Sequence, residues 1–428
     1  MEKKIIKRHP LGNPVRPWKQ DKFIFSAFNG VTDENQKIGF LNAQEAGFNM
    51  LEFGWATSEE LDRAIPIAEE VGMDIMIQDW RHFGGFQETR EKVIDMADLE
   101  EYVKFTKKYR HIVGYYVWDE PYYQSDIEKA RAQVDIMEKL DPERLPFVVA
   151  IPSYNKEYRY ENDLFDEYMD RYCKTIEPNV LSLDFYCIRG LNETDQIDQK
   201  NIYKDLFVMR RLCRQKKMPM WFYFQSSGDL SVVDGSMLGV NFRHIRDQVY
   251  LSLLYGTKGL QYYNITNGIV CRADGSKGEY FEDVKKLNRQ ILMWSPVLMS
   301  VESDAVYHSP EVLKDDPKFR SNYCDNIADS GIFDGELPNR ISAAEFSDCE
   351  GNKYIMIMNR DYIRRRPAEI KLKDYFRLYE VCKESGKQYV IAESANEIKL
   401  NLEPADAVLY RVQKTSEEAF DIEYVLEK

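Results

Sequence analysis

The stretch His111–Tyr123 reads HIVGYYVWDEPYY and joins an apolar strand to a pair of acids. Its first half, Ile112–Trp118, is rich in β-branched and aromatic residues, which favour a strand. Pro121 ends the strand because proline has no N–H for a ladder hydrogen bond. Asp119 and Glu120 therefore stand at the carboxyl end of a buried strand. In barrels and open parallel sheets, functional residues gather at that end.

The rest of the first 300 residues repeats this strand-then-helix pattern. Helical stretches with apolar residues three or four apart, such as Asp126–Leu140, separate the strand candidates. The strand candidates start near Lys22, Phe48, Met73, Ile112, Leu145, Asn179, Pro219 and Gly259. Eight strands, each followed by a helix, predict a (β/α)₈ TIM barrel. A doubly wound open sheet is the alternative, but the chain lacks the glycine-rich first turn of a dinucleotide fold.

After about Val301 the pattern changes to short alternating runs separated by turn residues, from RISAAEFSD at 340–348 to DAVLYRVQ at 406–413. Such runs predict a C-terminal all-β sandwich of antiparallel strands. The predicted organisation is an N-terminal arm at 1–21, a catalytic barrel at 22–300, a β-sandwich at 301–414 and an acidic tail at 415–428. We expect the tail to fray or to dock as a short helix.

Composition excludes several classes of function. A net charge of −14 opposes binding to nucleic acid, and no apolar run is long enough to predict a membrane span. The first residues are basic without an apolar signal-peptide core, which predicts a cytoplasmic protein as written, or a periplasmic or secreted one if a signal was removed. Seven cysteines without a CxxC pair and five scattered histidines predict no metal site and no cofactor. The oligomeric state is not indicated.

The carboxyl ends of the predicted strands supply the candidate site, because these ends converge on one cup in a barrel. Asp119 and Glu120 are the catalytic candidates. The candidate substrate-binding residues are Trp55, Asp79, Trp80, Asp184, Tyr186, Tyr223, Gln225, Tyr263 and Asn264. Carboxylates can transfer protons and stabilise a developing positive charge, while aromatic rings stack on sugars. This combination predicts a carbohydrate as the partner.

At these residues the chain resembles the (β/α)₈-barrel glycoside hydrolases, including the large clan A with Asn-Glu-Pro at the end of the fourth strand. The triplet here is Asp119-Glu120-Pro121. The resemblance implies that Glu120 is the general acid/base of a hydrolase that cleaves O-glycosidic bonds of a poly- or oligosaccharide. The chain departs from clan A at the seventh strand, where Gln225 stands in or next to the place of the nucleophilic Glu. A neutral amide cannot form the covalent intermediate.

Three interpretations of this departure remain. The chain is also similar to the substrate-assisted barrel hexosaminidases, in which an adjacent Asp orients a 2-acetamido group; this resemblance implies that role for Asp119. Alternatively, Asp79 or Asp184 is the base of an inverting hydrolase, provided that its carboxyl lies roughly 6.5–9.5 Å from that of Glu120. The third interpretation is a non-catalytic carbohydrate-binding barrel.

Overall fold

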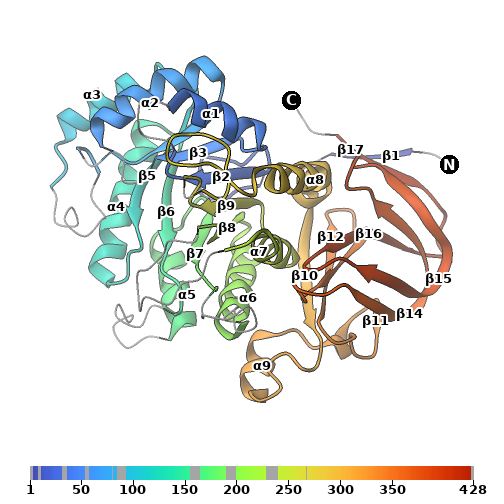
Figure 1. Ribbon diagram of the computed structural model, residues 1–428. Coiled ribbons are helices and arrows are strands. Elements are labelled where there is room, and N and C mark those ends of the chain that lie inside the picture. The colour runs from blue at the N-terminus through green and yellow to red at the C-terminus, as the bar shows by residue number, and fades with distance from the viewer. Residues whose placement is uncertain are drawn as a thin grey trace.

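Eight parallel strands close into a barrel in the computed structural model, which confirms the predicted (β/α)₈ fold (Figure 1). The model describes residues 3–7, 11–30, 36–53, 57–79, 81–83, 93–154, 164–188, 199–227, 240–266 and 268–425. The barrel strands are β2 (Ile24–Phe28), β3 (Met50–Phe53), β4 (Asp74–Ile77), β5 (Ile112–Asp119), β6 (Leu145–Ala150), β7 (Leu181–Phe185), β8 (Met220–Gln225) and β9 (Gly259–Tyr263). Nearly every residue of these strands is buried, because side chains pack on both faces.

One helix follows each barrel strand and covers the outside of the barrel. The helices are α1 (Gln36–Glu45), α2 (Ser58–Val71), α3 (Met96–Thr106), α4 (Gln124–Leu140), α5 (Phe165–Thr175), α6 (Gln199–Lys216), α7 (Phe242–Leu254) and α8 (Phe281–Ser300). Thr57 and Glu60 form a capping box at the start of α2, and Gly72 ends that helix in the left-handed conformation. In the ranges described, no helix combines the length and apolar character needed to cross a bilayer.

The predicted antiparallel β domain is also confirmed, and its strands form one seven-stranded sheet. Its strands are β10 (Val301–His308), β11 (Phe333–Asp334), β12 (Ile341–Asp348), β13 (Lys353–Asn359), β14 (Arg366–Val381), β15 (Gln388–Leu402) and β16 (Ala407–Lys414), and α9 (Pro317–Tyr323) is a short helix. Four of the alternating runs in the sequence merge into the two long strands β14 and β15. The pairing of β14 with β15 shifts register between Lys371 and Phe376, so the turn-like residues there belong to an irregular part of one strand.

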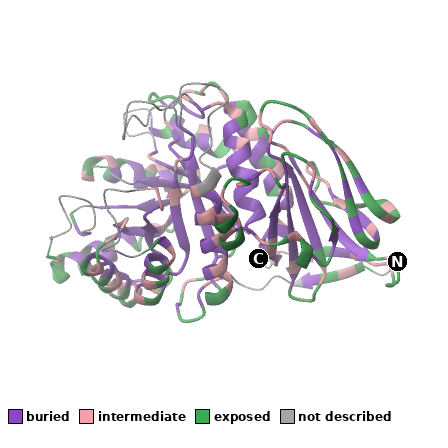
Figure 2. Cartoon of the chain, turned by 90° about the horizontal axis from the view of Figure 1, so that it is seen from below, coloured by how far each residue is buried: buried purple, intermediate pink, exposed green. Residues whose placement is uncertain are grey.

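Strand β13 of this domain is buried on both of its faces. Ile355 and Ile357 of β13 pack into the core of the β domain itself. The alternate residues Tyr354, Met356 and Met358 pack into the core that the barrel helices share. Figure 2 shows buried residues continuing from the barrel into the strands of the β domain. The two domains are therefore held together by a continuous apolar core.

A buried ion pair crosses this junction. Arg360, directly after β13, donates from Nε to Asp247 Oδ1 of α7 at 3.0 Å and from Nη2 to Asp247 Oδ2 at 3.1 Å. Its third nitrogen donates to the hydroxyl of Tyr203 at 2.9 Å. The side chains of Arg360 and Asp247 are 2% and 0% exposed, so neither charge has water as an alternative partner.

The first and last strands that the structure describes lie side by side next to the β domain (Figure 1). Strand β1 (Lys3–Lys7) pairs in parallel with β17 (Asp421–Val425). The acidic tail thus docks as a strand, and the expectation of a short helix there is wrong. Ile422 is buried and its neighbour Glu423 is exposed, which matches the two-residue period of a strand.

Replacing Arg360 with Met should destabilise the protein by about 3–5 kcal/mol, because Asp247 would keep a buried charge without its cation. Urea denaturation followed by circular dichroism measures this change. Arg365→Met, on the same loop, removes a cation whose ion pair with Glu403 is exposed, and it should cost less than about 1 kcal/mol. If the two variants lost the same stability, the buried ion pair between Arg360 and Asp247 would not be what stabilises the contact between the domains.

Candidate active site

A β-bulge in β5 directs Asp119 toward the inside of the barrel. The pairing of β5 with β6 skips Val117, because Tyr116 and Trp118 face consecutive residues of that strand. Tyr116 packs in the barrel interior, whereas Val117 and Trp118 both pack in the layer between strands and helices. The extra residue shifts the alternation by one position, so Asp119 returns to the same side as Tyr116.

A hydrogen bond fixes Asp119 on that side. The hydroxyl of Tyr116 donates to Asp119 Oδ1 at 2.8 Å. Burial raises the pKa of Tyr116 well above its ordinary value, and the negative charge of Asp119 adds to this effect. Tyr116 therefore stays protonated and acts as a donor.

Glu120 follows with an unusual backbone conformation. Its φ is +43°, in the left-handed region that non-glycine residues rarely adopt. The residue before a proline normally adopts an extended conformation, so Pro121 makes this geometry more demanding. Such strain costs on the order of 1–3 kcal/mol and tends to persist at functional sites. The bulge and this turn together present two adjacent acids at the carboxyl end of β5.

Asp184 of β7 is the third acid of this cluster. Its side chain interacts with those of Glu120 and Tyr186. Burial raises the pKa of Asp184 above its ordinary value, and the negative charge of Asp119 acts in the same direction, while the interactions with Glu120 and Tyr186 oppose the shift. Asp119, Glu120 and Asp184 therefore form one acidic cluster, in which at least one carboxyl retains its proton more readily than an isolated acid.

Aromatic rings line one side of the cluster. Tyr263 at the end of β9 stacks on Phe28 with ring centroids 5.4 Å apart and contacts Tyr186 at 4.8 Å. The charges of all three acids raise the pKa of Tyr263, after burial as the main cause. These two predicted tyrosines are therefore close to the acids and can contact a ligand bound there.

Tyr223 lies deeper in the barrel, where it binds a buried carboxyl. Its hydroxyl donates to Glu52 Oε2, while the Oε1 atom of Glu52 accepts from Ser26 and, at 2.9 Å, from Gln261. Glu52 is 0% exposed, and burial raises its pKa to about 7 against these hydrogen bonds. Ser182 in turn donates to Gln261 at 2.6 Å. The predicted binding residue Tyr223 thus belongs to a polar layer beneath the cup.

Gln225 and Asn264 both have partners in the protein backbone. The side-chain oxygen of Gln225 accepts from Ile188 N at 3.0 Å, and the side chain itself is fully buried. Its backbone is bound by Gln248 of α7, which accepts from its N–H at 3.1 Å and donates to its carbonyl at 2.9 Å. Asn264 accepts from Thr266 N at 3.1 Å and is 8% exposed. Gln225 therefore connects β7 to β8 and does not reach solvent.

Asp79, just after β4, is paired with a cation. Arg81 binds its two carboxylate oxygens from Nε at 3.0 Å and from Nη2 at 2.6 Å, and donates to it from the backbone at 3.0 Å. Burial alone would raise the pKa of Asp79, but the hydrogen bonds from Arg81 outweigh it and the pKa lies below its usual value. Asp79 is thus ionised and bound by Arg81. The predicted Trp55 and Trp80 lie outside the described residues.

Tyr116 and Glu52 complete the arrangement. Tyr116 was not among the predicted site residues, whereas Glu52 stands at the carboxyl end of the second predicted strand, one of the ends expected to converge on the cup. Tyr116 is three positions before Asp119, a spacing that regular alternation assigns to opposite faces of a strand, so only the bulge brings the two together. Glu52 has a weak signal in the sequence: it is a lone acid in the apolar run FNMLEFGW, which indicates a buried partner.

Solved structures share this architecture at very low sequence identity. One described as a glycoside hydrolase matches with a TM-score of 0.55 and 12% identity, over 92% of this chain and 93% of that chain. A GH27 β-L-arabinopyranosidase from Geobacillus stearothermophilus matches with a TM-score of 0.54 and 7% identity, over 94% and 98% of the two chains. No protein-family model and no curated protein sequence matches. At such identities the likeness establishes the fold, a barrel with a trailing β domain.

The raised pKa of Glu52 predicts a pH-dependent stability. The unfolded chain releases this proton near pH 4.5 and the folded chain near 7, so stability is greatest below the lower value and falls as pH rises through the higher one. The difference corresponds to a loss on the order of 3 kcal/mol. Glu52→Gln should therefore gain stability relative to the wild type between pH 5 and pH 8, as measured by urea denaturation.

Glu100→Gln, on the exposed face of α3, is the matched control and should differ from the wild type by the same small amount at every pH. A stability difference for Glu52→Gln that does not change with pH would contradict the assignment of a proton to Glu52.

Proposed function

We propose that the protein is a glycoside hydrolase in which Glu120 donates a proton to the glycosidic oxygen. The observation that carries this proposal is the cluster at the carboxyl end of the barrel, in which the carboxyls of Glu120 and Asp184 interact and Asp119 lies beside them. A general acid must hold a proton near neutral pH, and a half-buried carboxyl partner favours retention of one proton by the pair. The fold shared with solved glycosidases is consistent with this function.

The proposed reaction uses the substrate's own 2-acetamido group as the nucleophile. Asp119 accepts the amide N–H, and the acetamido oxygen attacks the anomeric carbon as the glycosidic bond breaks. Glu120 gives its proton to the leaving oxygen. Water, deprotonated by Glu120, then opens the resulting oxazolinium ion and restores the acid. The hydrogen bond from Tyr116 holds Asp119 in place, and the buried Gln225 is consistent with a reaction that takes no nucleophile from the seventh barrel strand.

The inverting alternatives fit the geometry less well. An inverting base must leave room for a water, at roughly 6.5–9.5 Å from the acid, whereas Asp184 is close enough to Glu120 for the two side chains to interact. Asp79 is already bound by Arg81 through both oxygens. Its lowered pKa also makes it a weaker base.

Glu120→Gln should reduce kcat by about 10²–10⁴-fold, because a general acid typically contributes that factor. Steady-state hydrolysis of oligosaccharide substrates measures the loss, and calorimetry should still detect substrate binding because the side chain keeps its shape. Glu128→Gln, on the exposed face of the following helix α4, makes the same change of charge and should leave the rate unchanged. Full activity in Glu120→Gln would remove Glu120 from its proposed role.

Asp119→Asn and Asp119→Ala should both lower the rate on N-acetylhexosaminides, because neither offers the charge that stabilises an oxazolinium ion. A panel of aryl hexosides and aryl N-acetylhexosaminides, with the product anomer read by NMR, tests the substrate class. A thiazoline mimic of the intermediate should inhibit.

Turnover of 2-hydroxy sugars with inversion, unaffected by the thiazoline, would instead favour Asp184 or Asp79 as base. Hydrolysis of no member of the panel would favour the carbohydrate-binding barrel.

A further inference from the structure

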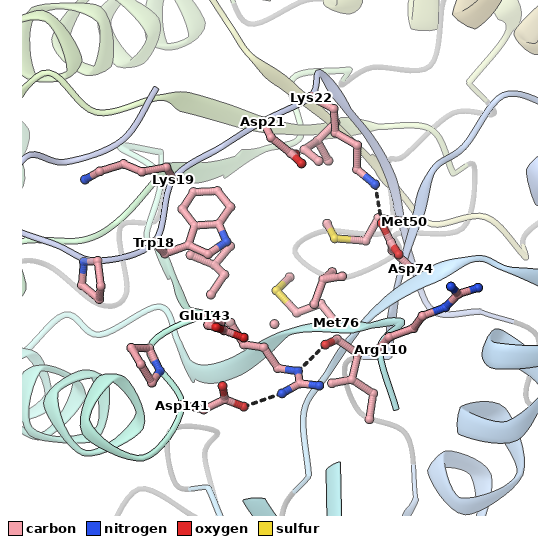
Figure 3. A pocket seen from close by; sticks show the side chains of 18 of the residues that line it. Trp18, Lys19, Asp21, Lys22, Met50, Asp74, Met76, Arg110, Asp141 and Glu143 are labelled. Carbon is pink, nitrogen blue, oxygen red and sulfur yellow. Dashed lines mark hydrogen bonds and ion pairs between the residues drawn. The ribbon is translucent and has the colours of Figure 1, made fainter. Parts of the chain in front are cut away.

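We propose that the cavity at the amino-terminal end of the barrel is a second carbohydrate-binding site, which takes a neutral oligosaccharide against Trp18. The cavity has a volume of about 1010 Å³ (Figure 3). It is lined by the first residues of several barrel strands and therefore opens at the end opposite Glu120. Its size matches sites that enclose small molecules. The choice of a sugar as the ligand rests on the function proposed above.

The aromatic wall of the cavity is held rigidly. Trp18 packs edge-to-face on the buried Trp221, with ring centroids 6.2 Å apart and an interplanar angle of 80°. Trp221 donates to Gln20 at 3.0 Å, and Gln20 donates to the carbonyls of Lys22 and Lys258 at 2.8 Å each. The arm that carries Trp18 is thus fastened across the bottom of the barrel. Trp18 is half-buried, so part of its indole is accessible for stacking.

The apolar floor faces this ring. In Figure 3 the side chains of Met50 and Met76 lie beside Trp18 around the centre of the cavity. Both methionines are buried, at 2% and 1% exposure, and belong to the same apolar cluster as Trp18. A ligand with one apolar face can therefore contact the floor and the ring together.

Several charged groups of the wall are bound by partners inside the protein. Lys22 pairs with Asp74, which also binds His111 at 2.9 Å. Arg144 pairs with Asp141 at 2.7 Å. Three backbone carbonyls, those of Asn13, Arg16 and Leu140, accept at 2.6 Å from Lys19 or Lys107. The lining thus carries charges of both signs, and such a mixture does not select an anion or a cation, which favours a neutral ligand.

Two exposed side chains at the rim can bind hydroxyl groups. Glu143 lies on the loop after α4 and Arg110 on the loop after α3, and Figure 3 shows them at different sides of the cavity. A carboxylate accepts and a guanidinium donates, so together they suit the mixed donors and acceptors of sugar hydroxyls. The combination of a flat ring, an apolar floor and such a rim is the chemistry of a saccharide site.

Titration calorimetry on Glu120→Gln protein, with cellohexaose, maltohexaose, xylohexaose and chitohexaose as probes, tests this proposal without consuming the ligand. We expect at least one probe to bind, and Trp18→Leu, which keeps an apolar contact with Trp221, to weaken that binding at least tenfold. Glu143→Ala changes only an exposed rim residue and should weaken it severalfold. Val15→Ala lies on the same arm outside the cavity and should have no effect.

Binding of none of the four probes, or binding that neither Trp18→Leu nor Glu143→Ala weakens, would overturn the second site. Tighter binding of inorganic phosphate than of every hexasaccharide would overturn the neutral ligand class. These outcomes are separable from failure of the proposed function: full turnover in Glu120→Gln would refute the hydrolase, whereas loss of turnover with no effect of Trp18→Leu on binding would refute only the second site.

Discussion

The buried carboxyl of Glu52 constrains the interior of the barrel. A carboxyl removed from water must find donors inside the protein, and here Ser26, Tyr223 and Gln261 converge on it from three other strands. Ser182 extends the network to β7 by donating to Gln261. A shift of any of these strands by one residue would reverse the faces of its side chains and remove its member from the network. The network therefore fixes the relative register of β2, β3, β7, β8 and β9.

The cup is built on this polar layer through aromatic contacts. Phe28 packs against Tyr223 of the layer at 6.1 Å, against Tyr116 at 6.4 Å and against Tyr263 at 5.4 Å. Tyr116 then holds Asp119 by a hydrogen bond. Because protein interiors are close-packed, a displaced ring at Phe28 would be transmitted to the rings that position the acids. The position of Asp119 therefore depends, through Tyr116 and Phe28, on Tyr223 of the polar layer.

The sequence predicted the features that follow from periodicity. Eight apolar strands alternating with helices have few other solutions than a closed barrel, and the proline after Glu120 marked where the fourth barrel strand ends. It could not predict the bulge at Val117, since a bulge depends on how β6 packs beside β5. Nor could it reveal that Gln225 accepts from Ile188, because that contact joins segments that only the closed barrel brings together. Asp79 and Asp184 looked alike as strand-end acids for the same reason.

Those two acids show how environment assigns different roles to one residue type. Asp79 has a guanidinium on both oxygens, and its pKa is lowered. Asp184 is removed from water beside the charge of Asp119, and its pKa is raised although its interaction with Glu120 opposes the shift. When their environments push the pKa values of two acids apart, the acid with the lower pKa stays ionised and the acid with the higher pKa can carry a proton. By this criterion Asp79 is the acid that holds a permanent charge beside Arg81, and Asp184 is the acid that retains a proton more readily.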